Sequence, residues 1–498
     1  MKELLDQLFV FEMANNHQGS VRHGIRIIEA MGRIAREHGI NAGVKLQYRE
    51  LETFIHPEAR ARTDVPHIPR FLETRLTDDE FLTLVEAIRD QGLRTVCTPF
   101  DEPSVDLLVD HGVEIIKVAS CSANDWPLLE YVAGANKPVI CSTGGRSLYE
   151  IDNLVSFMVH RWVAFGLMHC VGLYPTPNDD VQLDFMSRLM RRYPYVPVGY
   201  SGHECPDNVD VVKVAVAKGA AMLERHVGIP TESIALNTYS MTPAQTSCWV
   251  AGALQARTIG GGLRNGAERR IRQAEVDSLR SLARGAYARR AISKGEPIGR
   301  NDVFFAMPCL EGQTTSGEHQ DSMTASQDYA PLEPILERRA PSLVNQIRGI
   351  VHDAKGMLYE ANIDFGREFT IELSHHYGME HFRHVGALIV TVVNREYCKK
   401  LIVVLPGQKH PPHLHKVKEE TFHLLWGDLL INLDDRALTL GRGDTVLVER
   451  GVRHAFTTRG GAIFEELSTT HVAGDSYYDD ERIRALDPMQ RKTLLESW

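Results

Sequence analysis

The feature that most constrains the fold is an alternation between residues 9 and 260, where short apolar runs are each followed by a helical segment. The segments between the runs, such as GIRIIEAMGRIAREHG, carry apolar residues at helical spacing. Eight strand–helix units predict an α/β protein that begins with a (β/α)₈ TIM barrel. A doubly wound open sheet is the alternative, although no G-x-G-x-x-G follows the first run. The eight runs are LFVFEMA, GVKLQY, RTVCTPF, EIIKVAS, KPVICSTGG, VAFGLMHCVG, VPVGYSG and AMLERHVG.

Nearly every run ends in polar or reactive side chains. In a TIM barrel the carboxyl ends of all strands meet at one face, and active sites lie there. Residues far apart in the sequence would therefore converge on one site. The strand-end residues are Glu12, Lys45, Gln47, Thr98, Lys117, Ser120, Ser142, Thr143, His169, Ser201, His203, Glu224 and His226.

The rest of the chain changes character twice. Residues 311–330 are polar and rich in Gly, Ser and Thr, as in a loop or linker. From about residue 363, short strand-like runs separated by turns indicate an all-β barrel or sandwich. The predicted organisation is a TIM-barrel domain (1–265), a small domain (280–340), a helical linker (341–362), an all-β domain (363–475) and a C-terminal tail (476–498).

Composition narrows the classes of partner. No apolar run in the 498 residues approaches the roughly 20 residues that cross a bilayer, and the first 19 residues lack the apolar core of a secretion signal. The net charge of −10 argues against nucleic acid and anionic membranes as partners. The eight cysteines are scattered without a C-x-x-C pair, which fits reduced thiols, and we expect a cytoplasmic protein.

Two lysines and two histidines at the strand ends are candidates for binding an anion and a divalent metal ion. Lys45 and Lys117 could each pair with a barrel carboxylate, or together with the nearby hydroxyls they could cradle an anion. His203 and His226 end the seventh and eighth runs, and with Glu12 on the first run they could hold one divalent ion of the Mn, Zn or Fe type. The alternative is that each histidine is merely hydrogen-bonded.

The motifs FEMANNHQGS, GVKLQ, CTPFD, KVAS, STGG, HCVGLYPTP, VGYSGHE and MLERHVG resemble, in order, those of the sialic acid (N-acetylneuraminate) synthase family. They cover nearly the whole predicted barrel. The next segment, RGAYARRAISKGEPIGRND, resembles the small antifreeze-like (SAF) domain that follows the barrel in this family. The resemblance spans roughly the first two-thirds of the chain.

The resemblance implies a transferase that condenses phosphoenolpyruvate with the aldehyde of an acylated amino sugar such as N-acetylmannosamine. Phosphate and a sialic acid-like nine-carbon 2-keto acid would be the products. His203 and His226 would hold a divalent metal, commonly Mn, and Glu12 would lie beside it and help to activate water. Arg284 would reach the sugar pocket of a neighbouring subunit, which implies a domain-swapped homodimer. The implied substrate-binding residues are Lys45, Gln47, Thr98, Lys117, Ser120, Ser142, Tyr174, Ser201 and Arg284.

Two departures from the family leave the identity of the sugar open. The family usually has a Gly-Pro-Asp element after the eighth strand, whereas Leu236 and Asn237 stand near the expected aspartate here, with Glu232 as the closest acid in the sequence. Cys121 and Ser122 stand where the family often has Gly-Glu.

The stretch GQKHPPHLHKVKEETFHLLWG (407–427) resembles the first metal motif of the cupin superfamily, and GRGDTVLVERGVRH (441–454) resembles the second. The ligands would be His413, His415, Glu420 and His454. His413 and His415 are two apart on a strand, so both would face the same side. Three imidazoles and a carboxylate suit Mn, Fe, Zn or Ni. A histidine-rich loop without metal is the alternative, and His410 and His423 are expected bystanders.

Three functions fit these patterns. The first is a phosphoenolpyruvate-dependent synthase with an attached cupin that binds a second metal and a sugar. The second is a sugar-binding or sensing protein whose barrel no longer turns over. The third places the main activity in the cupin, because its KEETFH segment is similar to sugar-isomerase cupins such as the lyxose isomerase group.

Overall fold

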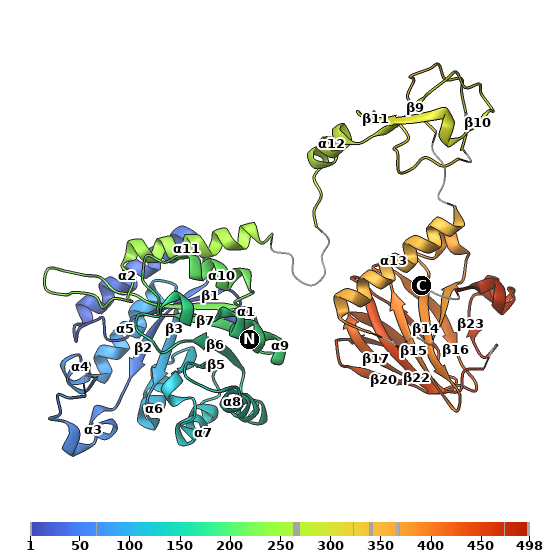
Figure 1. Cartoon of the computed structure of the whole chain (residues 1–498). Helices are drawn as coiled ribbons and strands as arrows, with labels where there is room; N and C mark the ends of the chain where they lie inside the picture. The colour runs from blue at the N-terminus through green and yellow to red at the C-terminus, as the bar shows by residue number, and fades with distance from the viewer. Residues whose placement is uncertain are drawn as a thin grey trace. The chain divides into compact units, whose positions relative to one another are not determined.

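The computed structural model describes residues 2–65, 67–261, 269–321, 323–337, 342–364, 366, 369–472 and 474–495. It divides into two compact units, Met1–Gly262 and Leu263–Trp498 (Figure 1). None of the helices in these ranges is long and apolar enough to cross a membrane. All eight cysteines are free thiols.

The first unit is a closed barrel of eight parallel strands, as the sequence predicts. β1 pairs with β2 on one side and with β8 on the other, which excludes the open sheet. The strands are β1 (Leu8–Glu12), β2 (Ala42–Tyr48), β3 (Arg94–Pro99), β4 (Ile115–Val118), β5 (Val139–Ser142), β6 (Phe165–Cys170), β7 (Val198–Gly202) and β8 (Met222–His226).

Apart from a short helix that precedes the first strand, the helices follow the strands and cover the barrel (Figure 1). Local chemistry sets their starts: Thr77, Ser147 and Thr242 each form a capping box, in which their side chains bond the first turn. The helices are α1 (Lys2–Leu5), α2 (Val21–His38), α3 (Leu51–Phe54), α4 (His67–Glu73), α5 (Asp78–Asp90), α6 (Glu102–Asp110), α7 (Trp126–Gly134), α8 (Leu148–His160), α9 (Leu183–Arg192), α10 (Asp210–Ala217) and α11 (Pro243–Ile259).

The alternation of side chains along each strand places an apolar layer below a polar one inside the barrel. On β1, Leu8 and Val10 belong to the apolar interior, and Glu12 follows two residues later at the carboxyl end. On β8, Met222 belongs to the same interior cluster and is followed by Glu224. The barrel is therefore closed by packing below and presents its polar groups at one mouth.

The second unit begins with a helix and two small antiparallel sheets. β9 pairs with β11, and β10 pairs with β12, around a small core that includes Ala286, Ile298 and Tyr329. These elements are α12 (Gln273–Leu282), β9 (Gly285–Ala288), β10 (Pro297–Ile298), β11 (Val303–Ala306) and β12 (Met323–Thr324).

The remainder of the unit is a domain of two antiparallel sheets, here named the large β-domain (residues 342–495). One sheet has the order β20-β17-β22-β15-β14-β13-β24 and the other β19-β18-β21-β16-β23. Its elements are α13 (Leu343–Ala361), β13 (Thr370–His375), β14 (Gly386–Asn394), β15 (Tyr397–Val404), β16 (Lys409–Leu414), β17 (Glu420–Gly427), β18 (Leu429–Leu433), β19 (Arg436–Leu440), β20 (Thr445–Val448), β21 (His454–Thr457), β22 (Ala462–Thr469), β23 (Tyr477–Tyr478), α14 (Glu481–Arg484) and β24 (Lys492–Leu495).

Two segments set apart in the sequence analysis belong to the core of the large β-domain. The predicted linker helix is α13, and its residues Ile350, Ala354 and Leu358 pack against the sheet that contains β13 and β14. In the predicted tail, β23 pairs with β16 and β24 pairs with β13. Both segments make backbone or apolar contacts that exist only in the folded sheet, so their local sequence patterns did not indicate that they belong to this domain.

Candidate functional site

The barrel mouth brings Glu12, Lys45 and His226 together. Glu12 on β1 lies in register with Lys45 on β2 and with His226 on β8. All three side chains are inside a parallel barrel whose strands are about 4.8 Å apart. The convergence predicted from the strand ends is therefore present.

Both lysines at the mouth are paired with carboxylates. Lys45 Nζ lies 2.5 Å from Glu12 Oε2 and 2.9 Å from Glu224 Oε1, and all three side chains are buried. Lys117 Nζ lies 3.6 Å from Glu224 Oε1. Glu224 was noted as a strand-end residue but was not assigned to the site by sequence reasoning, although it is two residues before His226 and faces the same side of β8.

Burial and charge shift the pKa values of these groups in different directions. Burial raises the pKa of Glu12 against the opposing effect of Lys45. Burial lowers the pKa of Lys117, and the Glu224 carboxylate partly offsets this. The two lysines together hold the pKa of Glu224 well below its usual range against burial. Glu224 is therefore ionised, whereas Glu12 is the better proton acceptor of the two.

Hydroxyls and backbone amides surround Lys117. Its Nζ donates a hydrogen bond to Ser142 Oγ at 2.5 Å, and Ser120 Oγ accepts one from Gly144 N at 3.0 Å. A Cβ at Gly144 would lie 2.8 Å from Ser120 Oγ, so only glycine permits this approach. A cation, two hydroxyls and a backbone amide form the kind of cradle that holds an oxyanion.

The other predicted ligands of the barrel also lie at the mouth. Gln47 Nε2 donates to Glu12 Oε2 at 3.4 Å, and Ser201 Oγ donates to Glu224 Oε1 at 2.8 Å. Thr98 is buried and in register with Gln47.

His203 and His226 face each other, with ring centroids 5.3 Å apart. His203 Nδ1 lies 3.0 Å from Val171 O, which leaves Nε2 free, and His226 Nδ1 is buried without a hydrogen-bond partner among the described residues. Burial lowers the pKa of each to about 3, so both imidazoles are neutral. Two neutral imidazoles with free nitrogens fit a divalent metal.

Two tyrosines cover the histidine pair. Tyr174, which the sequence analysis assigns to the substrate site, lies 4.3 Å from His203 between ring centroids. Tyr239 lies 5.1 Å from His226 and 5.1 Å from Tyr174. Sequence reasoning missed Tyr239, which lies in the stretch that departs from the family pattern.

The stretch between β8 and α11, which departs from the family pattern, supplies no carboxylate to the barrel mouth among its described residues. Asn237 Oδ1 accepts hydrogen bonds from the backbone of Tyr239 and Ser240, so it stabilises a turn. Leu236 lies against Gly228, and Glu232 is exposed. Arg284 is exposed directly before β9, in the second unit.

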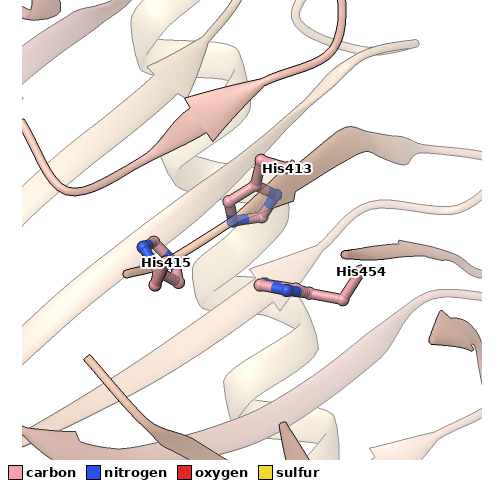
Figure 2. Close-up of side chains that lie close together, drawn as sticks. All are labelled: His413, His415 and His454. Atoms are coloured by element: carbon pink, nitrogen blue, oxygen red, sulfur yellow. The ribbon is translucent and has the colours of Figure 1, made fainter. Parts of the chain in front are cut away.

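The large β-domain contains a second cluster, formed by His413, His415 and His454 (Figure 2). One nitrogen of each imidazole lies within 4.8 Å of the others, and all three residues are buried. His413 on β16 is in register with His454 on β21. Among the described residues, this is the only group of three or more potential metal ligands whose ligand atoms lie this close together.

The imidazoles are oriented by backbone carbonyls. The Nδ1 atoms of His413, His415 and His454 lie 3.1, 2.6 and 3.2 Å from the carbonyl oxygens of Pro411, Asp475 and Val452. Each Nδ1 is therefore the donor, and each Nε2 keeps a free lone pair. Such carbonyl contacts are typical of metal-binding histidines, so the residues fit a divalent ion.

Glu420, the fourth predicted ligand, lies at the same place. Its carboxylate oxygens are 3.2 Å from His454 Nε2 and 3.5 Å from His415 Nε2. Lys418 also pairs with Glu420, and it lies 2.9 Å from Glu466, which in turn pairs with Lys400 at 3.0 Å. Sequence reasoning missed these buried ion pairs.

A cavity of about 360 Å³ opens over this cluster. The cluster histidines, Glu420, Lys418 and Glu466 line it. His410 also lines it, with Nε2 3.1 Å from His376 Nε2, whereas His423 is only half-buried and lies 3.6 Å from Glu465. The cavity is large enough for a small polar ligand.

The fold and these side chains define a TIM-barrel protein with a buried cluster of charged groups at the barrel mouth, joined to a β-domain with a histidine cluster. The model of the NeuB family matches residues 31–262, and that of the cupin domain matches residues 400–469. The chain belongs to the NeuB family and carries a cupin domain, which lies in the large β-domain.

Three relatives illustrate the similarity. A structure from Chromobacterium violaceum, a spore coat polysaccharide biosynthesis protein E, shares 44% identity over 66% of this chain and 98% of its own, with a TM-score of 0.63. The N-acetylneuraminate-9-phosphate synthase of Drosophila melanogaster is 31% identical over 45% of this chain, and the chain covers 61% of its length. The N,N'-diacetyllegionaminic acid synthase of Legionella pneumophila is 26% identical over 60% of this chain and 85% of its own.

Proposed function

We propose that the barrel condenses phosphoenolpyruvate with the aldehyde of an acylated amino sugar resembling N-acetylmannosamine. The products would be a nonulosonic 2-keto acid and phosphate. The observation that carries this proposal is the paired-lysine cluster at the barrel mouth, beside two neutral histidines and the hydroxyl cradle. Family membership and the relatives named as synthases of nonulosonic acids support the reaction class.

Different residues of the barrel mouth would bind the two substrates. Lys117, Ser120 and Ser142 would hold the phosphate of phosphoenolpyruvate, and Lys45 would hold its carboxylate end. Gln47, Thr98 and Ser201 would complete this side, and Tyr174 would contact the sugar. Cations fixed around the phosphate favour the leaving charge because they need no reorganisation during the reaction.

In the reaction, the enol carbon would form a carbon–carbon bond to the aldehyde carbon, the electron pair of the C=O π bond would move to the aldehyde oxygen, which takes up a proton to become a hydroxyl, and positive charge would develop at the carbon that bears phosphate. Water adds there, and the resulting tetrahedral species expels phosphate. Glu12 is placed to take the proton of that water, because its raised pKa makes it the stronger base of the two mouth carboxylates. Held by His203 and His226, a divalent metal such as Mn would act as a Lewis acid toward the aldehyde.

We also propose that the cupin domain binds a second divalent metal, Mn, Fe, Zn or Ni, through His413, His415, Glu420 and His454. The observation that favours this site is the set of three free Nε2 atoms beside the cavity. The cavity and its lysine–glutamate pairs would take a sugar or a related polyol. We further propose that the small sheets are an SAF-like domain whose Arg284 completes the sugar site of a partner subunit in a domain-swapped homodimer.

The test is phosphate release from phosphoenolpyruvate with Mn, across a panel of acylated amino sugars and plain hexoses. Under the proposal, release depends on one class of sugar and is abolished by His226→Ala. The matched variant His413→Ala keeps most of the release, because it alters the other domain. An equal loss in the two variants would contradict the assignment of the reaction to the barrel.

A further inference from the structure

Arg49 continues the row of inward-facing residues on β2. Side chains on a strand alternate, so Lys45, Gln47 and Arg49 point to the same side, with Arg49 one residue beyond the end of β2 at Tyr48. Lys45 is the deepest of the three and Arg49 the outermost. Arg49 therefore lies at the rim of the proposed catalytic site.

The guanidinium of Arg49 is held in place by rings and a neutral amide. Its central carbon lies 3.7 Å from the ring centroid of Phe100 and 4.1 Å from that of Phe71. One terminal nitrogen donates to Gln47 Oε1 at 2.8 Å, whereas Nε is buried and has no hydrogen-bond partner in the described ranges. Within those ranges no carboxylate lies within 4.0 Å of this group, so the cation is oriented but not neutralised.

The acids whose charge reaches Arg49 are engaged elsewhere. Glu12 pairs with Lys45. Asp101 accepts hydrogen bonds from the backbone amides of Glu50 and Ser104, both at 2.9 Å, and caps α6. Burial lowers the pKa of Arg49 to about 10, and the group stays charged at neutral pH. A half-buried cation without a carboxylate is costly unless an anion from a ligand meets it.

A small cleft of about 30 Å³ opens beside this guanidinium. Asn15, His17, Gln47, Arg49 and Phe71 are among the residues that line it. The cleft has room for one small group rather than for a whole sugar. It lies on the β1–β2 side of the mouth, whereas the cradle of Lys117, Ser120 and Ser142 is built from β4, β5 and the turn after β4.

We propose that Arg49 binds an anionic group, a carboxylate or a phosphate, at the far end of the aldehyde substrate. This inference rests on the proposed function of the barrel. The anion belongs to the aldehyde because both charged groups of phosphoenolpyruvate already have cations, its phosphate at Lys117 on β4 and its carboxylate at Lys45, which lies deeper on β2 than Arg49.

The experiment is a calorimetric titration of the whole protein with three alditols, in the presence of Mn and phosphoenolpyruvate. The probes are the alditol of N-acetylmannosamine, its 6-phosphate and its 6-carboxylate, which cannot condense because the aldehyde has been reduced. We expect one anionic alditol to bind at least about 10-fold more tightly than the neutral one, because a charge-assisted hydrogen bond of this kind is worth a factor of about 10 to 100. The better anion identifies the group as phosphate or carboxylate.

Variants test whether Arg49 causes the preference for the anionic alditols. Arg49→Gln should remove the preference for the anion, Arg49→Lys should keep part of it, and the control Arg62→Gln should keep all of it, since Arg62 is exposed and paired with Asp64. Equal binding of the three alditols would overturn the inference, as would an anion preference that persists in Arg49→Gln. Weaker binding of phosphoenolpyruvate in Arg49→Gln, with the alditol preference unchanged, would also overturn it.

Phosphate release from the corresponding aldehydes keeps the two proposals separate. Tight, Arg49-dependent alditol binding without phosphate release from any aldehyde would contradict the synthase reaction and keep the anion site. Release with neutral aldehydes that Arg49→Gln does not alter would keep the synthase and overturn the anion site. If Arg49→Gln unfolds at a lower temperature than the wild type, Arg49→Lys decides, because it retains the charge and the packing of the stem.

Discussion

Removing the Glu224 carboxylate should destabilise the barrel, because this group balances two buried lysines. Its Oε1 lies 2.9 Å from Lys45 Nζ and 3.6 Å from Lys117 Nζ, and it also accepts the hydrogen bond of Ser201 at 2.8 Å. Glu224→Gln keeps the shape and removes the charge. Breaking a buried ion pair from one side costs about 3–5 kcal/mol.

This free energy converts into a measurable shift. For a domain the size of the barrel, each kcal/mol changes the melting temperature by about 2–4 °C, so the barrel transition should fall by about 6–20 °C. Scanning calorimetry measures it, and the transition of the second unit serves as an internal reference because the change lies outside it. Glu130→Gln is the matched control, since Glu130 is exposed and pairs with Arg161 at the surface, where such pairs add little.

A double variant tests the cause. If Glu224 stabilises by balancing charge, then Lys117→Met combined with Glu224→Gln should lose less stability than the two single changes added together. A melting temperature for Glu224→Gln within about 2 °C of the wild type, which corresponds to a loss of no more than about 1 kcal/mol, would refute the reasoning. Strict additivity in the double variant would refute it as well.

Three further predictions follow from the same structure. His454→Ala should lower the divalent metal bound per chain by about one equivalent in elemental analysis, and His410→Ala should not, because only the former removes a free Nε2 from the cluster; equal metal contents would count against the site. Burial lowers the pKa of His17 to about 4, so the unfolded chain takes up a proton at a higher pH than the folded chain does. About 3 kcal/mol of stability should therefore be lost as the pH falls from 6.5 to 4. Denaturant unfolding of His17→Asn should show a correspondingly weaker pH dependence. Gly427→Ala should destabilise the large β-domain by about 2–4 kcal/mol, because a Cβ there would lie 2.0 Å from Gly461 O at a φ of +83°, and an unchanged thermal transition would contradict the close approach.

The barrel and the residues at its mouth could be predicted because the alternation of side chains along each strand combines with the closure of the barrel. Each strand alternates inward and outward residues, and closure of the barrel brings the inward residues at the carboxyl ends together, so Glu12, Lys45 and His226 could be assigned before their distances were known. His413 and His415 could be assigned from a similar spacing, because they are two residues apart, although β16 ends at Leu414, one residue before His415.

Pairings between distant strands could not be predicted in this way. The choice of Glu224 as the shared partner of Lys45 and Lys117 depends on which side chains meet across the barrel, and no local pattern records it. Lys418 pairs with Glu466 for a similar reason, since β17 and β22 lie side by side although more than forty residues separate these two positions. The packing of α13 on its sheet is likewise a tertiary contact.

The central claim is that the barrel makes a carbon–carbon bond at the expense of phosphoenolpyruvate. The most direct measurement is mass spectrometry of the products together with phosphate release, for the wild type and for His226→Ala. We predict one phosphate for each molecule of a keto acid whose mass is that of the aldehyde plus pyruvic acid, and the loss of both in His226→Ala. Phosphate released without such a keto acid, or a keto acid that forms equally well in His226→Ala, would contradict the account.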